Sequence, residues 1–176
     1  MSTSECVTLT DAEIWIAEYL VRERRKSTLD AVESASESGI VLPITVDRMR
    51  SSRNPIEVER DGMEAELAFC RYQNIYPDIE STCRSTTHQI DCVTSSGVRV
   101  DVKWCARTTD HLMAMPHKIG CDEIDAFVLV QGKRPTFRIV GWTPFSTLID
   151  VSNLRNFGHG PAYAMRQEDL SSMDTF

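Results

Sequence analysis

The segment over residues 89–104 constrains the fold more strongly than any other part of this sequence. Over its second half, apolar and charged residues alternate one by one: Val98, Arg99, Val100, Asp101, Val102 and Lys103. Neighbouring side chains of a strand point to opposite faces of a sheet, so the pattern predicts a strand with a buried valine face and a charged face. The run over residues 88–93 predicts the partner strand of a β-hairpin.

The length of the hairpin loop decides which side chains face each other. A three-residue loop over residues 95–97 places Gly97 at the position that requires a positive φ, and it sets Asp91 opposite Asp101. A two-residue loop would instead set Asp91 opposite Val100. The longer loop is favoured because it explains why a glycine occupies position 97.

The pairing of Asp91 with Asp101 points to a cation site. Two carboxylates that face each other across a strand pair repel, which destabilises the sheet unless a cation neutralises them. Mg²⁺ takes one or two carboxylates and keeps several waters, and Lys103 on the same face could meet a phosphate oxygen. An exposed Asp-x-Lys pair is usually only a solvated ion pair. The second acid across the turn is what favours a metal site that can accept a polyanion.

A helix predicted before the hairpin offers a further acid. Residues 56–72 show helical periodicity with apolar side chains on one face. The helix carries Glu64 and Glu66, which lie about 200° apart around its axis. At most one of them can therefore face the site.

Asp91 followed by Asp101-Val102-Lys103 resembles the signature of the PD-(D/E)XK, or restriction-endonuclease-like, nuclease superfamily. Residues 62–69 resemble the helix before that hairpin, in which a Glu points into the site of many members. Two further segments resemble later strands of small phage and prokaryotic members: residues 126–132 and 136–142. The likeness covers about residues 58–170.

The resemblance departs from the usual form at Ile90, where many members have Pro. It implies an α/β fold with a restriction-endonuclease-like core, in which helices flank a central mixed β-sheet. The nuclease-like domain would span residues 56–176, after an N-terminal helical extension over residues 1–55. In that extension we expect helices at 10–26 and 27–38, through which a second copy or a protein partner could bind.

The resemblance also implies a role for each residue of the motif. Asp91 and Asp101 would be metal ligands together with the Val102 carbonyl, and Lys103 would be the catalytic lysine. Glu66, rather than the Glu two residues earlier, aligns with the family pattern and would hold the metal through a water or bind a second one. The implied cofactor is Mg²⁺, for which Mn²⁺ would substitute.

Four residues outside the motif are candidates for substrate contacts: Arg107, His117, Lys118 and Gln131. Arg107 lies just beyond the catalytic lysine, and Gln131 ends a predicted strand. For the segment at 117–118, a surface loop without a role in binding is the competing interpretation. The function implied is a Mg²⁺-dependent deoxyribonuclease that hydrolyses phosphodiester bonds.

The net charge of −7 bears on this function, because contact with phosphates needs local Lys and Arg. An acidic chain must bind DNA through a focused site rather than through its overall field. The charge also keeps open an alternative, a non-catalytic module that retains the nuclease fold and binds nucleic acid or protein. The acid–acid–Lys set argues for the enzyme.

Targeting features and cysteine usage predict the compartment. No segment approaches the ~18 apolar residues that span a bilayer, and the N-terminus lacks the basic and apolar regions of a secretory signal. The six cysteines form no C-x-x-C pair, which is typical of reduced thiols. We expect a cytoplasmic protein without a membrane partner, in the host cytoplasm if it is phage-encoded.

Overall fold

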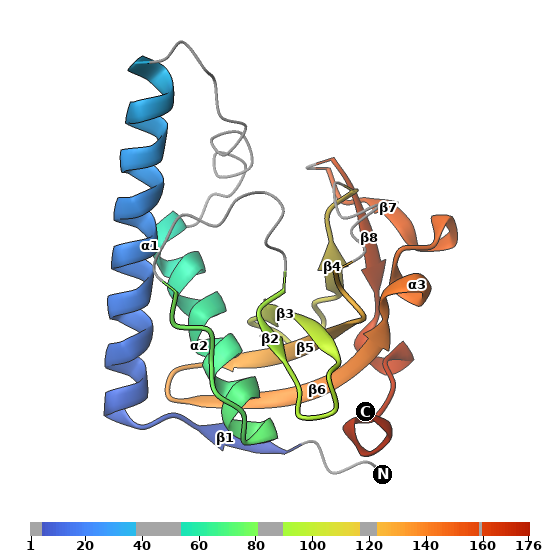
Figure 1. Ribbon diagram of the computed structural model, residues 1–176. Coiled ribbons are helices and arrows are strands. Elements are labelled where there is room, and N and C mark those ends of the chain that lie inside the picture. The colour runs from blue at the N-terminus through green and yellow to red at the C-terminus, as the bar shows by residue number, and fades with distance from the viewer. Residues whose placement is uncertain (1–4, 38–53, 81–89, 117–122, 159) are drawn as a thin grey trace.

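A computed structural model of the 176-residue chain describes residues 5–37, 54–80, 90–116, 123–158 and 160–176. Its helices are α1 (Asp11–Glu37), α2 (Pro55–Gln73) and the short α3 (Phe145–Leu148), with single 3₁₀ turns at η4 (Val151–Asn153), η5 (Gln167–Asp169) and η6 (Met173–Thr175). Its strands are β1 (Cys6–Thr8), β2 (Cys92–Val93), β3 (Arg99–Cys105), β4 (Leu112–Ala114), β5 (Ala126–Lys133), β6 (Thr136–Pro144), β7 (Leu154–Asn156) and β8 (Pro161–Met165). The fold is therefore mixed α/β (Figure 1).

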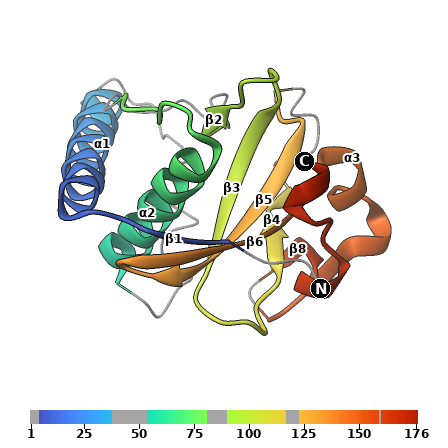
Figure 2. The ribbon, with the colours of Figure 1, turned by 90° about the horizontal axis from the view of Figure 1, so that it is seen from below.

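Within the described residues, five strands form the main sheet in the order β1-β6-β5-β3-β2. Strands β3 and β5 run parallel, and the other neighbours run antiparallel, so the sheet is mixed as predicted. Figure 2 shows that α2 lies between α1 and this sheet. Opposite the helices lies a second sheet in the order β4-β8-β7 (Figure 1).

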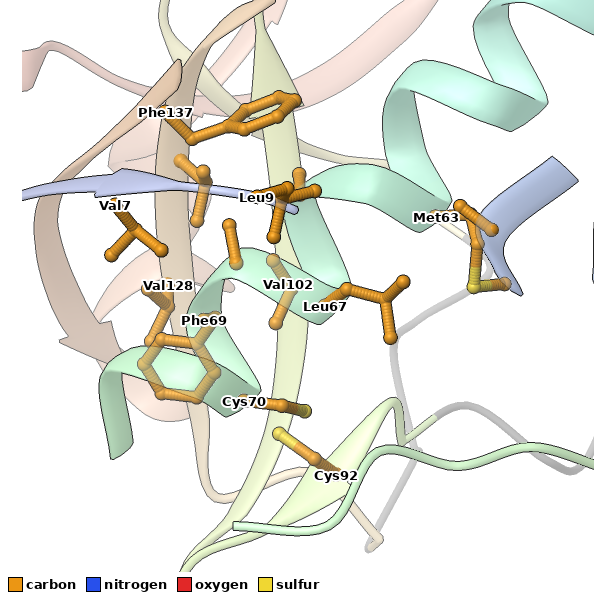
Figure 3. Close-up of a cluster of buried hydrophobic side chains, with 14 of the residues drawn as sticks. Val7, Leu9, Met63, Leu67, Phe69, Cys70, Cys92, Val102, Val128 and Phe137 are labelled. Carbon is orange, nitrogen blue, oxygen red and sulfur yellow. The ribbon is translucent and has the colours of Figure 1, made fainter. Parts of the chain in front are cut away.

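The main sheet is buried on both faces. On one face, Val100 and Val102 of β3 and Val128 of β5 pack against α2. Figure 3 shows part of this core, with Phe69 of α2 close to Val128 and with the thiols of Cys70 and Cys92 turned toward each other. On the other face, a second cluster includes Phe127 and Leu129 of β5 with residues of β4 and β8. Such two-sided burial explains the continuous apolar run of β5.

The hairpin has the predicted three-residue loop. The Thr94 amide donates to the Val98 carbonyl at 2.9 Å, and Cys92 pairs with Val100. Gly97 has a φ of 86°, which is the left-handed conformation that glycine adopts without strain. The prediction of the loop, and with it the register of the two strands, is confirmed.

The two helices expected at 10–26 and 27–38 form the single helix α1, and that prediction was wrong. The helix begins with a capping box, in which Thr10 Oγ1 accepts from the Glu13 amide and the Glu13 carboxylate accepts from the Thr10 amide. It continues through the basic cluster at residues 22–26, which therefore lies in its middle and not at its end.

The start of α2 has the expected signals, since the Asn54 side chain accepts from the Ile56 amide and Pro55 occupies the first turn. The N-terminal part of the chain also supplies β1, which the sequence analysis did not predict. The segment at 38–53, which links α1 to α2, lies outside the described residues. None of the helices described has the length and apolar composition that crossing a bilayer requires.

Candidate active site

The centre of the site is the charged face of β3. The Lys103 Nζ donates a hydrogen bond to Asp101 Oδ1. The Asp101 residue is only 1% exposed, whereas 27% of the Lys103 side chain remains accessible. The ammonium also lies 6.0 Å from the centroid of the Phe127 ring on the neighbouring strand. A buried carboxylate is therefore paired with a lysine whose side chain is partly accessible.

Asp91 stands where the hairpin strand separates from β3. Its amide donates to the Val100 carbonyl at 2.8 Å, and its Oδ2 accepts from the Val102 amide at 2.8 Å. The carboxylate thus takes over the bond that the next backbone carbonyl of a regular ladder would make. This contact fixes Asp91 against β3 at Val102, the residue next to Asp101.

The two acids of α2 lie in different surroundings. Glu64 is fully buried and forms ion pairs with Arg134 and Arg60. Burial raises the pKa of Glu64, although Arg134 opposes the shift. Glu66 is partly exposed and pairs with Arg24 of α1 at 3.6 Å. Glu66, not Glu64, is the α2 acid that acts on Lys103.

The pKa of Lys103 records this electrostatic environment. Burial lowers the pKa, but the carboxylates of Asp101, Asp91 and Glu66 together outweigh burial and raise it. The three acids come from β3, from the segment before β2 and from α2. An ammonium under three negative charges stays protonated at neutral pH.

The donor chemistry around Lys103 fits a divalent cation. Mg²⁺ takes hard oxygen ligands and needs only one or two carboxylates, since waters complete its shell. Asp91 and Asp101 supply such oxygens from adjacent backbone segments. In the part of the chain that the structure describes, no three His, Cys, Asp or Glu residues form a cluster that could hold a metal ion. The candidate ligands at this position are therefore limited to the two carboxylates of Asp91 and Asp101.

Arg24 approaches the site and was missed by the sequence analysis. Its Nε and Nη2 donate to the backbone carbonyls of Glu80 and Asp78 at 2.9 and 3.0 Å, and its Nη1 lies 3.6 Å from the Glu66 carboxylate. Arg24 also lines a cavity of about 260 Å³ between α1 and α2, which Glu66 borders. The signal was the basic cluster at residues 22–26, at the end of the helix that we expected over residues 10–26.

Two of the four predicted substrate contacts lie in the part of the chain that the structure describes. Arg107 lines a cavity of about 450 Å³ beside Lys103. The Gln131 Oε1 accepts from the Arg138 guanidinium at 2.6 and 2.9 Å, and Gln131 is not among the residues that line that cavity. His117 and Lys118 lie outside the described residues.

The motif residues Glu66, Asp91, Asp101 and Lys103 thus act on one another, whereas Gln131 is engaged elsewhere. This grouping comes from α2, from the segment before β2 and from β3. Comparisons with protein-family models, with curated proteins and with solved structures found no match to the chain, so its functional interpretation rests on the geometry of this site.

Proposed function

We propose that this protein is a Mg²⁺-dependent nuclease with a restriction-endonuclease-like core, which hydrolyses phosphodiester bonds in DNA. The observation that carries the proposal is the grouping of two acids and a lysine at β3: Asp91 accepts from the Val102 amide at 2.8 Å, and Lys103 pairs with Asp101. The carboxylate of Glu66 adds a third negative charge that acts on Lys103. Counting the Arg24 guanidinium that pairs with Glu66, the three acids and Lys103 still leave one excess negative charge at a partly buried position. A divalent cation is the natural group to balance this excess, and a bound cation would then accept a phosphate.

The order of the elements supports the same core. The helix that carries Glu66 precedes the hairpin that carries the other three residues, and β5 then pairs in parallel with β3. This is the order of helix, hairpin and later strands on which the sequence resemblance rests. It places the motif at the end of the sheet where the short strand β2 leaves β3.

The ligands in this proposal are the carboxylates of Asp91 and Asp101 and the carbonyl of Val102. A divalent cation bound there would polarise the scissile phosphate and lower the pKa of a bound water. The Val102 amide already holds the Asp91 carboxylate at 2.8 Å, so this ligand is oriented before any substrate arrives. Glu66 would hold a water of the site or bind a second cation.

Lys103 has two tasks in this mechanism. Its ammonium orients the attacking water, and it offsets the negative charge that develops on the phosphate in the transition state. The carboxylates around it keep the amine protonated, so it donates hydrogen bonds and does not act as a base. Its accessible side chain can follow the phosphate while Asp101 stays buried.

A second candidate function is a binding module without catalysis. The net charge of −7 favours it, because a free-standing nuclease usually has a basic track for its substrate. The ion pair between Lys103 and Asp101 would then be structural, and no cation would be needed. The two candidates differ in whether the carboxylates bind a metal.

Titration calorimetry with Mn²⁺ separates the two candidates. The wild-type protein is expected to give a saturable heat that is lost in Asp91→Asn, because the amide removes the charge of the ligand. The asparagine oxygen can still accept from the Val102 amide, so this variant should fold. Asp101→Asn should lose the heat as well.

Asp125→Asn is the matched control for this titration. Asp125 pairs with Arg99 at 2.7 Å on the surface of the same sheet and lies outside the motif. The Asp125→Asn variant should bind Mn²⁺ like the wild type. A wild-type protein with no saturable heat, or variants that all bind equally, would favour the binding module.

A further inference from the structure

The cavity of about 450 Å³ beside Lys103 has walls of three kinds. One wall is the end of β3, the second is the turn at residues 106–111, and the third consists of Met113 of β4 and Phe157, which follows β7. Its size lies within the ~300–1,000 Å³ of small-molecule sites. Lys103, whose ammonium is assigned to the scissile phosphate, lines the cavity, so a group that enters the cavity would lie next to that phosphate.

The outer wall offers the faces of two rings. The rings of His111 and Phe157 are 5.5 Å apart between centroids and are tilted by 52°. Phe157 is 48% exposed and Met113 is 39% exposed, although both are large apolar residues. An exposed aromatic face beside a phosphate site is what a stacking nucleobase requires, because every base has a π-face.

The turn that bears His111 is held in place by bonds to neighbouring segments. The Gln167 amide donates to the carbonyls of Arg107 and Asp110 at 3.0 and 2.9 Å. Asp110 in turn accepts from the Arg107 backbone amide at 3.0 Å and pairs with its guanidinium at 2.9 Å. The turn is therefore preorganised, and it does not need to order itself when a ligand binds.

The rim of the cavity carries a cation for a second phosphate. The Arg107 side chain is 78% exposed even though its guanidinium contacts Asp110. Lys103 and Arg107 therefore give the cavity two positive groups besides its ring wall. A nucleotide strand has the complementary pattern, since each base lies between two phosphates.

We infer that this cavity binds an unpaired nucleobase adjacent to the scissile phosphate, with the base stacked on the Phe157 ring, which His111 contacts from the side of the turn. The inference rests on the proposed nuclease function and deepens it, because it names single-stranded DNA as the substrate class. In a duplex, both faces of an internal base are covered by its neighbours, so such a base enters only after unstacking at a cost of a few kcal/mol. Single strands and unpaired ends enter without that cost.

The test is binding of a short single-stranded oligodeoxynucleotide, measured by fluorescence anisotropy with EDTA to prevent hydrolysis and again with Ca²⁺. Phe157→Ala is expected to weaken binding about 5- to 150-fold, the range for loss of one base–aromatic stack. Phe157→Tyr keeps a ring and should bind like the wild type. Binding of the duplex of the same sequence should change by less than about twofold, because its bases do not enter the cavity.

Trp15→Ala is the matched control, because Trp15 is also an exposed aromatic residue stacked on a neighbouring ring, that of Tyr19 on α1. It should leave binding of both DNA forms unchanged. A single-stranded RNA of the same sequence is a further arm, and dependence on Phe157 with RNA alone would overturn the assignment to DNA.

The outcomes separate this inference from the nuclease proposal. If Phe157→Ala binds single strands like the wild type, or weakens single strand and duplex equally, the inference fails whether or not the protein cleaves DNA. If single-strand binding depends on Phe157 but Mg²⁺ gives no hydrolysis, the inference stands and the nuclease proposal fails. If the wild type prefers the duplex, the inference is overturned.

Discussion

Replacement of Lys103 by alanine is expected to lower the rate of Mg²⁺-dependent DNA cleavage by at least about 100-fold, the usual cost of removing one preorganised transition-state donor. The ammonium is held by Asp101 and kept protonated by the surrounding acids, so it is ready to orient water and to offset charge. The alanine methyl can do neither. Initial rates on single-stranded and duplex DNA measure the effect.

Metal binding by Lys103→Ala shows whether the loss of cleavage comes from the reaction step or from a loss of the metal. Lys103 competes with a cation for the Asp101 carboxylate, so Lys103→Ala should bind Mn²⁺ at least as tightly as the wild type. Circular dichroism and a urea unfolding curve should be recorded with Mn²⁺ present, because the variant removes this ion-pair partner from a buried acid. Lys103→Arg is the companion variant: it keeps the charge but changes the shape of the donor. Cleavage by Lys103→Ala at the wild-type rate would refute the role assigned to the lysine.

Glu66→Gln and Glu64→Gln are expected to have opposite consequences. Because Glu66 acts on Lys103, replacing its carboxylate by the side-chain amide of Gln should lower the rate of cleavage about 10- to 100-fold, the usual effect of losing an outer metal partner. Its partly exposed carboxylate contributes little to stability. The free energy of unfolding of Glu66→Gln should therefore stay close to the wild-type value.

Glu64→Gln is the matched variant two residues away on the same helix. It removes a buried acid that pairs with Arg134, in the turn between β5 and β6, and the loss should cost about 1 kcal/mol of unfolding free energy. The cost is modest because the glutamine side chain keeps an oxygen beside the Arg134 guanidinium. Cleavage should be unchanged. If Glu64→Gln impaired cleavage and Glu66→Gln did not, the assignment of the helix acid would be wrong.

The hairpin could be predicted from the sequence because its signals are local. The alternation in β3 fixes which residues face the α2 side, and the positive φ of Gly97 fixes the loop length. Together they determine the register that brings Asp91 beside β3. That Glu64 and Glu66 lie in different surroundings could also be said in advance, since a helix turns two such residues to different sides, whereas the choice of Glu66 came from the family resemblance.

The continuity of α1 could not be predicted from composition. Residues near its predicted break include serines and threonines, which often end helices by bonding to nearby backbone groups. In α1 they instead satisfy their hydroxyls on the preceding turn, since Thr28 Oγ1 donates to the Arg24 carbonyl at 2.8 Å and Ser34 Oγ donates to the Asp30 carbonyl at 2.9 Å. The helix therefore continues and carries Arg24 to Glu66.

The remaining errors come from pairings between distant parts of the chain. Strand β1 has only three residues, too few for a periodic pattern, and its partner β6 lies far along the sequence. The sheet of β4, β7 and β8 is also built from short strands, of three, three and five residues. That sheet and the segment after β7 bring Met113 and Phe157 to the cavity beside Lys103, and no local signal in the sequence indicates this contact.

The most direct test of the nuclease proposal is incubation of the wild-type protein with Mg²⁺ and linear, circular and single-stranded DNA, beside a single-stranded RNA and with Asp101→Asn as the blank. We predict Mg²⁺-dependent hydrolysis of DNA, fastest on the single strand, which EDTA stops and the blank lacks. Intact DNA in every lane, or the same products from wild type and blank, would contradict the proposal.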